Sequence, residues 1–218
     1  MIGAVIAMQS EANILLDEMK IERSLTISGK QVFIGSVYGK QTAVCICGVG
    51  KVNAALGAQL LISKFDVKLL LNFGVAGGLN QDTKLCNVYR IFEAVQFDFD
   101  LVQLNGGKIG TLNEYEENYL PLNDLDFPFE KKRLGTSDRF NDSPADYQLL
   151  TEELQADIRD MEGCAIVQAA LCAKLPVYAF KAISDVAGSG STTEQYLCNR
   201  DKALSNLKAN LPRIFDKF

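Results

Sequence analysis

Short apolar runs alternate with helical patterns along the whole chain, and this alternation restricts the possible folds more than any other feature. Runs rich in Val, Ile and Leu, bounded by polar residues or glycine, occur at 2–7, 42–47, 67–73 and 177–183. Such runs are typical of strands in a sheet that is covered on both faces. Further strands are expected within 24–37, around the turn Ser28-Gly29-Lys30, and at 85–95.

Helical patterns fill the intervals between these runs. Ser10 is placed to cap a helix that runs to about Lys20, and residues 53–64 carry an apolar stripe. Further helices are expected at 145–154, 161–174 and 192–216. The alternation predicts one three-layer α/β/α domain over residues 1–218, with a mixed, mainly parallel central sheet. Residues 96–130 have the poorest regular pattern and are expected to form a loop excursion.

Composition narrows the choice of partners. The net charge of −5 argues against nucleic acid, because binding to phosphates needs clustered Lys and Arg, so a small ligand is expected. No apolar run reaches the length of a membrane span, and residues 1–7 are typical of a first strand, not a signal peptide, so a cytoplasmic protein is expected. The six cysteines are expected to be reduced and mostly buried, without a zinc site.

The chain contains no histidine, and this absence excludes whole mechanisms. Catalytic triads and His-ligated metal sites cannot be built from this chain alone. If the protein is an enzyme without a cofactor, proton transfer falls to Asp, Glu, Lys, Tyr or Cys. Carboxylates are the groups most often used to cleave glycosidic bonds. Carboxylates in unusual positions are therefore the first candidates for a site.

Three such positions follow expected strands or begin an apolar helix. Glu11 lies in the first turn of a helix, where it can also simply complement the helix dipole. Asp160 and Glu162 flank a methionine at the start of an apolar helix, which packing alone explains poorly. Asp185 ends an apolar strand, where burial would raise its pKa and make it an acid near neutral pH, although it can equally cap the next turn.

A glycine-rich stretch, residues 72–79, follows the strand at 67–73. Glycines let the backbone approach a ligand closely, but they also serve simple chain reversal. Because ligands of open α/β sheets bind at the carboxyl ends of strands, this stretch and the three acidic positions are expected to meet there.

In order, these segments resemble the nucleoside phosphorylase and nucleosidase superfamily, and most closely the 5′-methylthioadenosine/S-adenosylhomocysteine nucleosidases. The resemblance covers nearly the whole chain. It is carried by Ala7-Met8 through Glu11, Gly48-Val49-Gly50-Lys51-Val52-Asn53-Ala54-Ala55, Ala76-Gly77-Gly78-Leu79, Ser137-Asp138-Arg139-Phe140, Asp160-Met161-Glu162-Gly163 and Ala182-Ile183-Ser184-Asp185.

The resemblance implies hydrolysis of a purine nucleoside with no cofactor and no metal. Asp185 would protonate or hydrogen-bond N7 of the base, and Glu11 would orient and deprotonate water. It further implies that Glu162 holds the ribose hydroxyls, and that backbone groups near Asn141 help to recognise the base. Members of this kind are usually homodimers, and residues 96–130 are expected to reach the partner. The expected substrate-binding residues are Met8, Val49, Val75, Ala76, Gly77, Phe140, Asn141, Asp160, Met161, Glu162 and Ser184.

Several departures from the family pattern leave the substrate open. Val75 stands where the nucleosidases usually carry Ser, Asp160 where they carry Glu, and Phe97 where they carry His. An aromatic residue that closes over the substrate has no clear match at 193–196. Phosphorylases of the superfamily bind phosphate with arginines that are lacking at 8–11 and 72–73, which favours water as the nucleophile. A futalosine hydrolase, a phosphorylase and a nucleoside-binding protein without catalysis are the alternatives.

Overall fold

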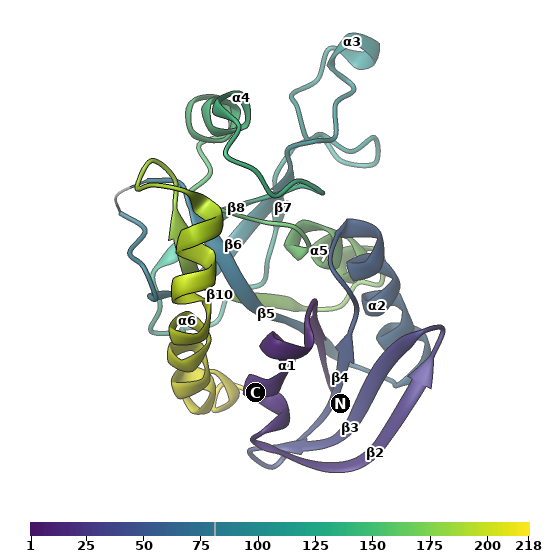
Figure 1. The fold of residues 1–218 in the computed structure, drawn as a ribbon. Helices are drawn as coiled ribbons and strands as arrows, with labels where there is room; N and C mark the ends of the chain where they lie inside the picture. Colours follow the sequence, from purple (N-terminus) through teal and green to yellow (C-terminus); the bar gives the residue numbers. More distant parts are fainter. Residues whose placement is uncertain (81) are drawn as a thin grey trace.

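A computed structural model describes residues 1–80 and 82–218, and its strands form a single mixed sheet (Figure 1). Along the sheet the order is β10-β6-β8-β9-β5-β1-β4-β3-β2, with β7 beside β6. The strands are β1 (Ile2–Ile6), β2 (Met19–Ile27), β3 (Lys30–Val37), β4 (Lys40–Ile46), β5 (Leu69–Gly78), β6 (Val88–Gln96), β7 (Leu120–Pro121), β8 (Lys131–Thr136), β9 (Ile158–Asp160) and β10 (Val177–Val186).

One half of the sheet closes on itself. Because β10 pairs with both β5 and β6, the path β5-β10-β6-β8-β9 returns to β5 and forms a barrel-like ring. Among the described strands, five pairings are parallel and five antiparallel. The sheet is therefore mixed, as expected, but it is neither mainly parallel nor open. Closure depends on β8 and β9, which are short and polar and lack the apolar signal of a buried strand.

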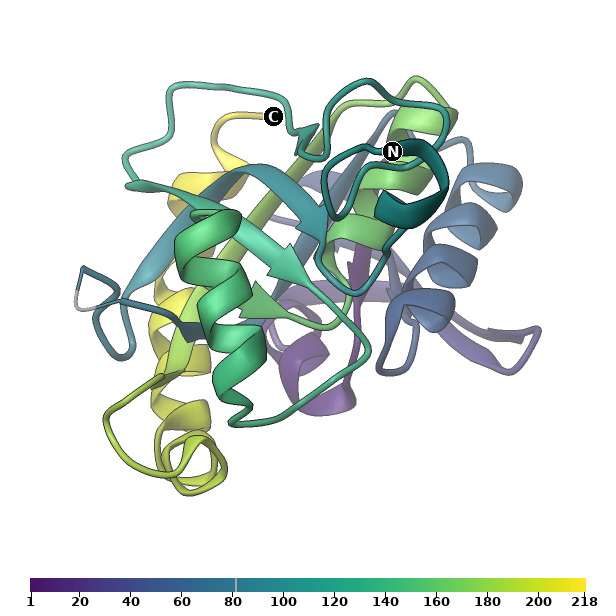
Figure 2. The ribbon, with the colours of Figure 1, turned by 90° about the horizontal axis from the view of Figure 1, so that it is seen from above.

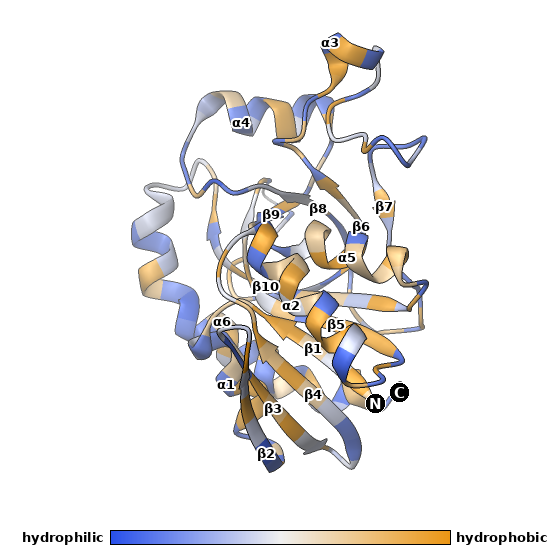
Figure 3. Cartoon of the chain, turned by 90° about the vertical axis from the view of Figure 1, so that its right-hand side faces the viewer, coloured by the Kyte–Doolittle hydropathy of each residue, from blue (hydrophilic) through white to orange (hydrophobic). Residues whose placement is uncertain are grey.

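Helices cover the sheet on two sides (Figures 1 and 3). On one side, α2 (Lys51–Lys64) and α5 (Gly163–Cys172) contact each other and share one apolar cluster. On the other side, α1 (Gln9–Leu16) and the long α6 (Thr192–Phe215) share a second cluster. The apolar strands between them lie inside, which places the strand ends, and not the sheet faces, within reach of a ligand.

A third, smaller cluster lies outside the ring. The segment α4 (Pro144–Gln148) continues into a π-helical turn, η1 (Leu149–Glu153), beside the ring (Figure 2). Leu150 is fully buried there with Val95 and Phe97. Gly135 of β8 has no side chain, and the Leu150 side chain occupies the space that a Cβ would fill. The expected helix at 145–154 is therefore present, with its second half widened into a π-turn.

Other expectations differ in their boundaries. The first helix begins at Gln9 and ends at Leu16, with Met8 as its N-cap, so Ser10 does not cap it. The glycine-rich stretch is not a turn, because β5 continues through Gly78. Residues 96–130 are irregular as expected, apart from the end of β6, a four-residue helix, α3 (Val102–Asn105), and the short β7.

The cysteines are free, as expected, and four of the six are buried. The exposed two, Cys172 and Cys198, lie on helix surfaces. In the part of the chain that the structure describes, no helix combines the length and the apolar character needed to cross a bilayer.

Candidate active site

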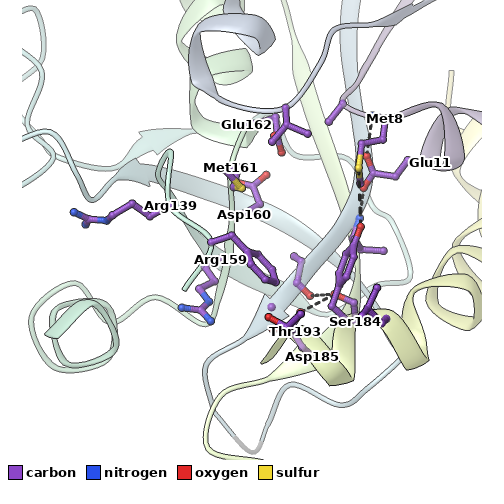
Figure 4. Close-up of a pocket in the computed structure, with 18 residues that line it drawn as sticks. Met8, Glu11, Arg139, Arg159, Asp160, Met161, Glu162, Ser184, Asp185 and Thr193 are labelled. Carbon is purple, nitrogen blue, oxygen red and sulfur yellow. Dashed lines mark hydrogen bonds between the residues drawn. The ribbon is translucent and has the colours of Figure 1, made fainter. Parts of the chain in front are cut away.

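A cavity of about 340 Å³ opens where the carboxyl ends of β1, β5 and β10 meet the starts of α1 and α5 (Figure 4). Twelve of the thirteen residues predicted from the sequence line it. They are Met8, Glu11, Val49, Val75, Ala76, Gly77, Phe140, Asp160, Met161, Glu162, Ser184 and Asp185. The structure therefore brings together residues that are spread over most of the chain.

Asn141 is the exception among the predicted residues. Its side-chain amide donates to Asp146 Oδ2 at 3.0 Å, and its Oδ1 accepts from the backbone N–H of Ser143 at the same distance. The side chain thus stabilises the start of α4, and Asn141 does not line the cavity. Only the backbone of this residue remains a candidate for base recognition.

Glu11 is buried in the first turn of α1, with 4% of its surface exposed. The backbone N–H of Val75 donates to Oε1 at 2.9 Å, and that of Met8 donates to Oε2 at 3.3 Å. Gly74 makes this position possible, because a Cβ there would lie 2.7 Å from Oε1. Burial raises the pKa of Glu11, and the charge of Lys181 works against this rise.

Lys181 is a fully buried cation beneath this carboxylate. It pairs with Gly74 across β5 and β10, so its side chain leaves the sheet on the side where Glu11 lies. Its Nζ contacts Asp160 Oδ2 at 2.8 Å, and both side chains are 2% exposed. Burial opposes the charge of Lys181, but Asp160 and Glu162 raise its pKa, so it stays protonated. Lys181 therefore compensates several acids at once.

Glu162 lies at the N-cap of α5, and its Oε1 accepts a hydrogen bond from the backbone N–H of Gly50 at 2.8 Å. Burial and the negative charge of Asp160 raise the pKa of Glu162 to about 7, although Lys181 opposes them. The loop that carries Gly50 is fixed in turn by Asp138, which accepts from the backbone N–H of Lys51 at 2.7 Å. Two loops far apart in the sequence thus hold one carboxylate over the cavity.

The raised pKa of Glu162 predicts an unusual pH dependence of stability. The folded protein binds the proton more tightly than the unfolded chain, so the free energy of unfolding falls as pH rises from about 4.5 to about 7. We expect Glu162→Gln to remove a large part of this fall, because the amide is neutral throughout. Denaturant unfolding at pH 5 and pH 7.5 measures the difference, and an equal fall in both proteins would contradict the assignment.

Asp185 lies at the other end of the cavity, near the end of β10, with 2% of its surface exposed. Ser184 Oγ donates to its Oδ2 at 2.7 Å. A Cβ on Gly77, its neighbour in β5, would lie 2.7 Å from Oδ1, so this glycine makes room for the acid. Burial raises the pKa of Asp185, while Ser184 and Arg159 oppose the rise.

Six further lining residues were not among the predicted set. Tyr196 is the most informative, because its ring packs edge-on against Phe140, with centroids 5.8 Å apart and an angle of 68°. It supplies an aromatic wall in the segment 193–196, where the aromatic residue of the family pattern has no clear match in the sequence. The sequence signal that could have pointed to Tyr196 is its position in the second turn of α6, just after the N-cap Ser191. The six are Ala7, Arg139, Arg159, Thr193, Tyr196 and Leu197.

The cavity wall is mostly apolar, and its ionisable groups are chiefly acids. In residues 1–80 and 82–218, no three His, Cys, Asp or Glu side chains group in a way that could hold a metal ion. The arrangement offers a buried carboxylate able to accept a proton at one end and a buried carboxyl able to donate one at the other.

Fold and site together define an α/β protein of the nucleoside phosphorylase type. Solved structures share this fold: a futalosine hydrolase of Helicobacter pylori superposes with a TM-score of 0.91 at 21% identity, covering 100% of this chain and 97% of that one. A 5′-methylthioadenosine/S-adenosylhomocysteine nucleosidase of Colwellia psychrerythraea, solved in complex with adenine, also has a TM-score of 0.91, at 25% identity over 99% of this chain and 94% of that one.

The chain belongs to the phosphorylase superfamily, whose family model matches residues 1–217. Sequence comparison agrees with the structural one. A 5′-methylthioadenosine/S-adenosylhomocysteine nucleosidase of Colwellia psychrerythraea is 30% identical over 89% of this chain and 88% of its own length. The predicted resemblance is therefore confirmed at the level of the family.

Proposed function

We propose that the protein hydrolyses the N-glycosidic bond of 5′-methylthioadenosine and S-adenosylhomocysteine, releasing adenine. The observation that carries this proposal is the placement of Glu11 and Asp185 over two glycines of one strand. Gly74 and Gly77 are three residues apart, about 10 Å along β5. That span suits a ribosyl group between a carboxylate that activates water and an acid that protonates the base. The similar nucleosidases support the choice of substrate.

The chemistry uses these two groups in one displacement. Glu11 takes a proton from water, whose oxygen bonds to C1′ of the ribose. The C1′–N9 bond breaks, and its electron pair goes to the purine. Asp185 gives its proton to N7, so the base leaves as a neutral molecule. The raised pKa of Asp185 favours the protonated form that this step requires.

The other lining residues bind the substrate in this proposal. Glu162 accepts hydrogen bonds from the ribose hydroxyls, Met161 contacts the sugar, and Phe140 stacks on the base. Met8, Val49 and the aromatic Tyr196 form part of the apolar wall of the cavity. The remaining proposed contacts come from Val75, Ala76, Gly77, Asp160, Ser184 and the Asn141 backbone.

Water is the proposed nucleophile because acids surround the position that it would occupy. Glu11, Asp160 and Glu162 face it with Lys181 as their buried counter-charge, and a phosphate dianion would be repelled. Incubation with each nucleoside, with and without phosphate, tests this. Free adenine and free 5-methylthioribose without phosphate support hydrolysis, whereas phosphate dependence and a ribose 1-phosphate would identify a phosphorylase.

Val75 lines the cavity where the nucleosidases usually carry Ser, so an apolar side chain replaces a hydroxyl near the ribose. This difference favours two alternative functions. A hydrolase of another purine nucleoside, such as futalosine, would use the same two acids. A nucleoside-binding protein without catalysis would bind without releasing base. The same incubations, extended to further purine nucleosides and to binding measurements, separate these possibilities.

Glu162→Ala is expected to weaken ribose recognition more than chemistry. Its carboxylate is held at the cavity by the backbone N–H of Gly50, and in this proposal Asp185, not Glu162, protonates the leaving base. We expect KM for the nucleoside to rise at least tenfold, with a smaller fall in kcat. The expected KM penalty should be much smaller for a 2′,3′-dideoxyribosyl substrate, which lacks the hydroxyls. A fall in kcat alone, with KM unchanged, would contradict this role.

Our proposal includes one domain over residues 1–218, a cytoplasmic location, no cofactor and a homodimer. The dimer is supported by exposed apolar side chains on α2 and α3. Val52 and Leu56 on α2 are 71% and 56% exposed, and Leu104 on α3 is 78% exposed. Sedimentation at micromolar concentration distinguishes a dimer from a 23.9 kDa monomer.

A further inference from the structure

Three neighbouring strands place an acid, a glycine and an arginine in one row on the cavity floor. Gly77 of β5 pairs with Asp185 of β10 on one side and with Arg159 of β9 on the other. A Cβ on Gly77 would lie 2.7 Å from Asp185 Oδ1 and 3.3 Å from Arg159 Nε. Because Gly77 has no side chain, the Asp185 carboxylate and Nε of Arg159 can both lie close to its backbone, whereas Nη2 of Arg159 is directed to Thr192 and Asp142. Both residues line the cavity (Figure 4).

The guanidinium group is only loosely held by the protein. Its side chain is 12% exposed. Nη2 donates a long hydrogen bond of 3.4 Å to Thr192 Oγ1, and it lies 3.9 Å from Asp142 Oδ1, whose side chain is 55% exposed. Among the described residues these are its polar contacts, so most of its five N–H donors are available to a ligand.

The chemistry of purines identifies what such a donor would bind. N7 and the substituent at C6 lie on the same edge of the ring. A 6-oxopurine presents two acceptors there, whereas a 6-aminopurine presents one acceptor and one donor. When the N7 atom of a base is at Asp185, its C6 substituent lies next to that acid. An arginine beside the acid matches an oxygen at C6 and does not match an amino group.

We propose that Arg159 is a specificity-determining residue that lets the site accept 6-oxopurine nucleosides as well as 6-aminopurine nucleosides. In the 6-oxopurine complex, Arg159 donates a hydrogen bond to O6 of the base while Asp185 donates to N7. This inference rests on the proposed function, because it places N7 at Asp185. It extends that function to a second class of base, the 6-oxopurines, and names the side chain that recognises them.

The test compares two nucleosides that differ only at C6, 5′-methylthioadenosine and 5′-methylthioinosine. The ratio of kcat/KM for the 6-oxo over the 6-amino substrate is measured for the wild type, Arg159→Met and Arg159→Lys. We expect the methionine variant to lower this ratio about tenfold to a hundredfold, the range of one well-placed arginine–base contact. The lysine variant, which keeps a donor, should restore part of it. Asp142→Asn is the matched control, because it removes the acidic neighbour of Arg159 and should leave the ratio unchanged.

An unchanged ratio in Arg159→Met, an equal change in Asp142→Asn, or a wild type that cleaves only the 6-amino nucleoside would overturn the inference while leaving the proposed hydrolysis intact. If neither nucleoside is cleaved, the proposed function fails, and calorimetric binding of hypoxanthine and adenine decides this inference separately. Hypoxanthine binding that weakens at least tenfold in Arg159→Met, with adenine binding unaffected, supports it. An equal effect on both bases overturns it.

Discussion

Asp185→Asn is expected to lower kcat for nucleoside hydrolysis by about 10²- to 10⁴-fold, the usual contribution of a general acid. Asparagine has nearly the shape of aspartic acid, so it fits the space that Gly77 leaves open. Its amide can still donate a hydrogen bond to N7, but it cannot give up a proton. We therefore expect binding of the substrate to change much less than turnover. Steady-state kinetics with 5′-methylthioadenosine measures both.

Two further variants make this result specific. Ser184→Ala removes the hydroxyl that donates to Asp185 Oδ2, and we expect a smaller loss of kcat because the acid itself remains. Asp201→Asn changes a carboxylate that is 83% exposed on α6, and it should leave kcat unchanged. Near-normal turnover in Asp185→Asn would refute the assigned acid.

The sequence located these acids because each stands where an apolar pattern stops. Asp185 interrupts a run that is buried along its whole length, and Glu11 lies in the first turn of the helix that follows the first strand. An ionisable group in such a place has a raised energy unless a function or a partner compensates for it. The same reasoning marked Asp160 and Glu162, and all four acids line the cavity.

The sequence does not predict that the sheet closes into a ring, because the two strands that close it lack the pattern of buried strands. β8 reads Lys-Lys-Arg-Leu-Gly-Thr, and β9 has only three residues. Their side chains do not alternate in the way that predicts a buried strand. They join the ring because their backbones complete the pairing between β6 and β5. Arg159 was not singled out as a site residue, since its place beside Asp185 depends on the pairing of β9 with β5.

Asn141 and Tyr196 illustrate a second limit, which concerns side-chain direction. The sequence shows that a residue is near the site, but not which way it points. Asn141 turns to its local neighbours because Asx side chains readily cap the adjacent turn. Tyr196 turns inward because Phe140 offers an aromatic edge. Local hydrogen bonds and ring packing thus determine which side chains point into the cavity.

The glycines of β5 explain how two ionisable groups fit against a buried strand. A Cβ at either Gly74 or Gly77 would come within 2.7 Å of a carboxylate oxygen. Each acid therefore lies directly against the backbone, where it is shielded from water and its pKa rises. The strand separates the two acids along its length. One site can then keep a base at one end and an acid at the other.

Glu11→Gln is expected to lower kcat by about 10²- to 10⁴-fold, because the amide cannot accept the proton of the attacking water. In the wild type, Glu11 must be ionised to act, so kcat should fall as pH decreases through its raised pKa. Asp185 must be protonated, so kcat should also fall at high pH. The variant should lose the acidic limb of this profile and keep the alkaline one. Initial rates across the pH range, for both proteins, measure the two limbs.

The control for this variant is Glu18→Gln, which neutralises an exposed glutamate two residues after the end of α1, outside the cavity. It should leave both kcat and the pH profile unchanged. Glutamine at position 11 retains an oxygen that can accept the N–H of Val75, so the fold around the site should survive. A large loss of kcat in a well-folded Glu11→Gln protein then reports on the proton transfer itself. If that protein retained the acidic limb, the base would have to be another group, and Glu162, whose pKa is about 7, would be the next candidate.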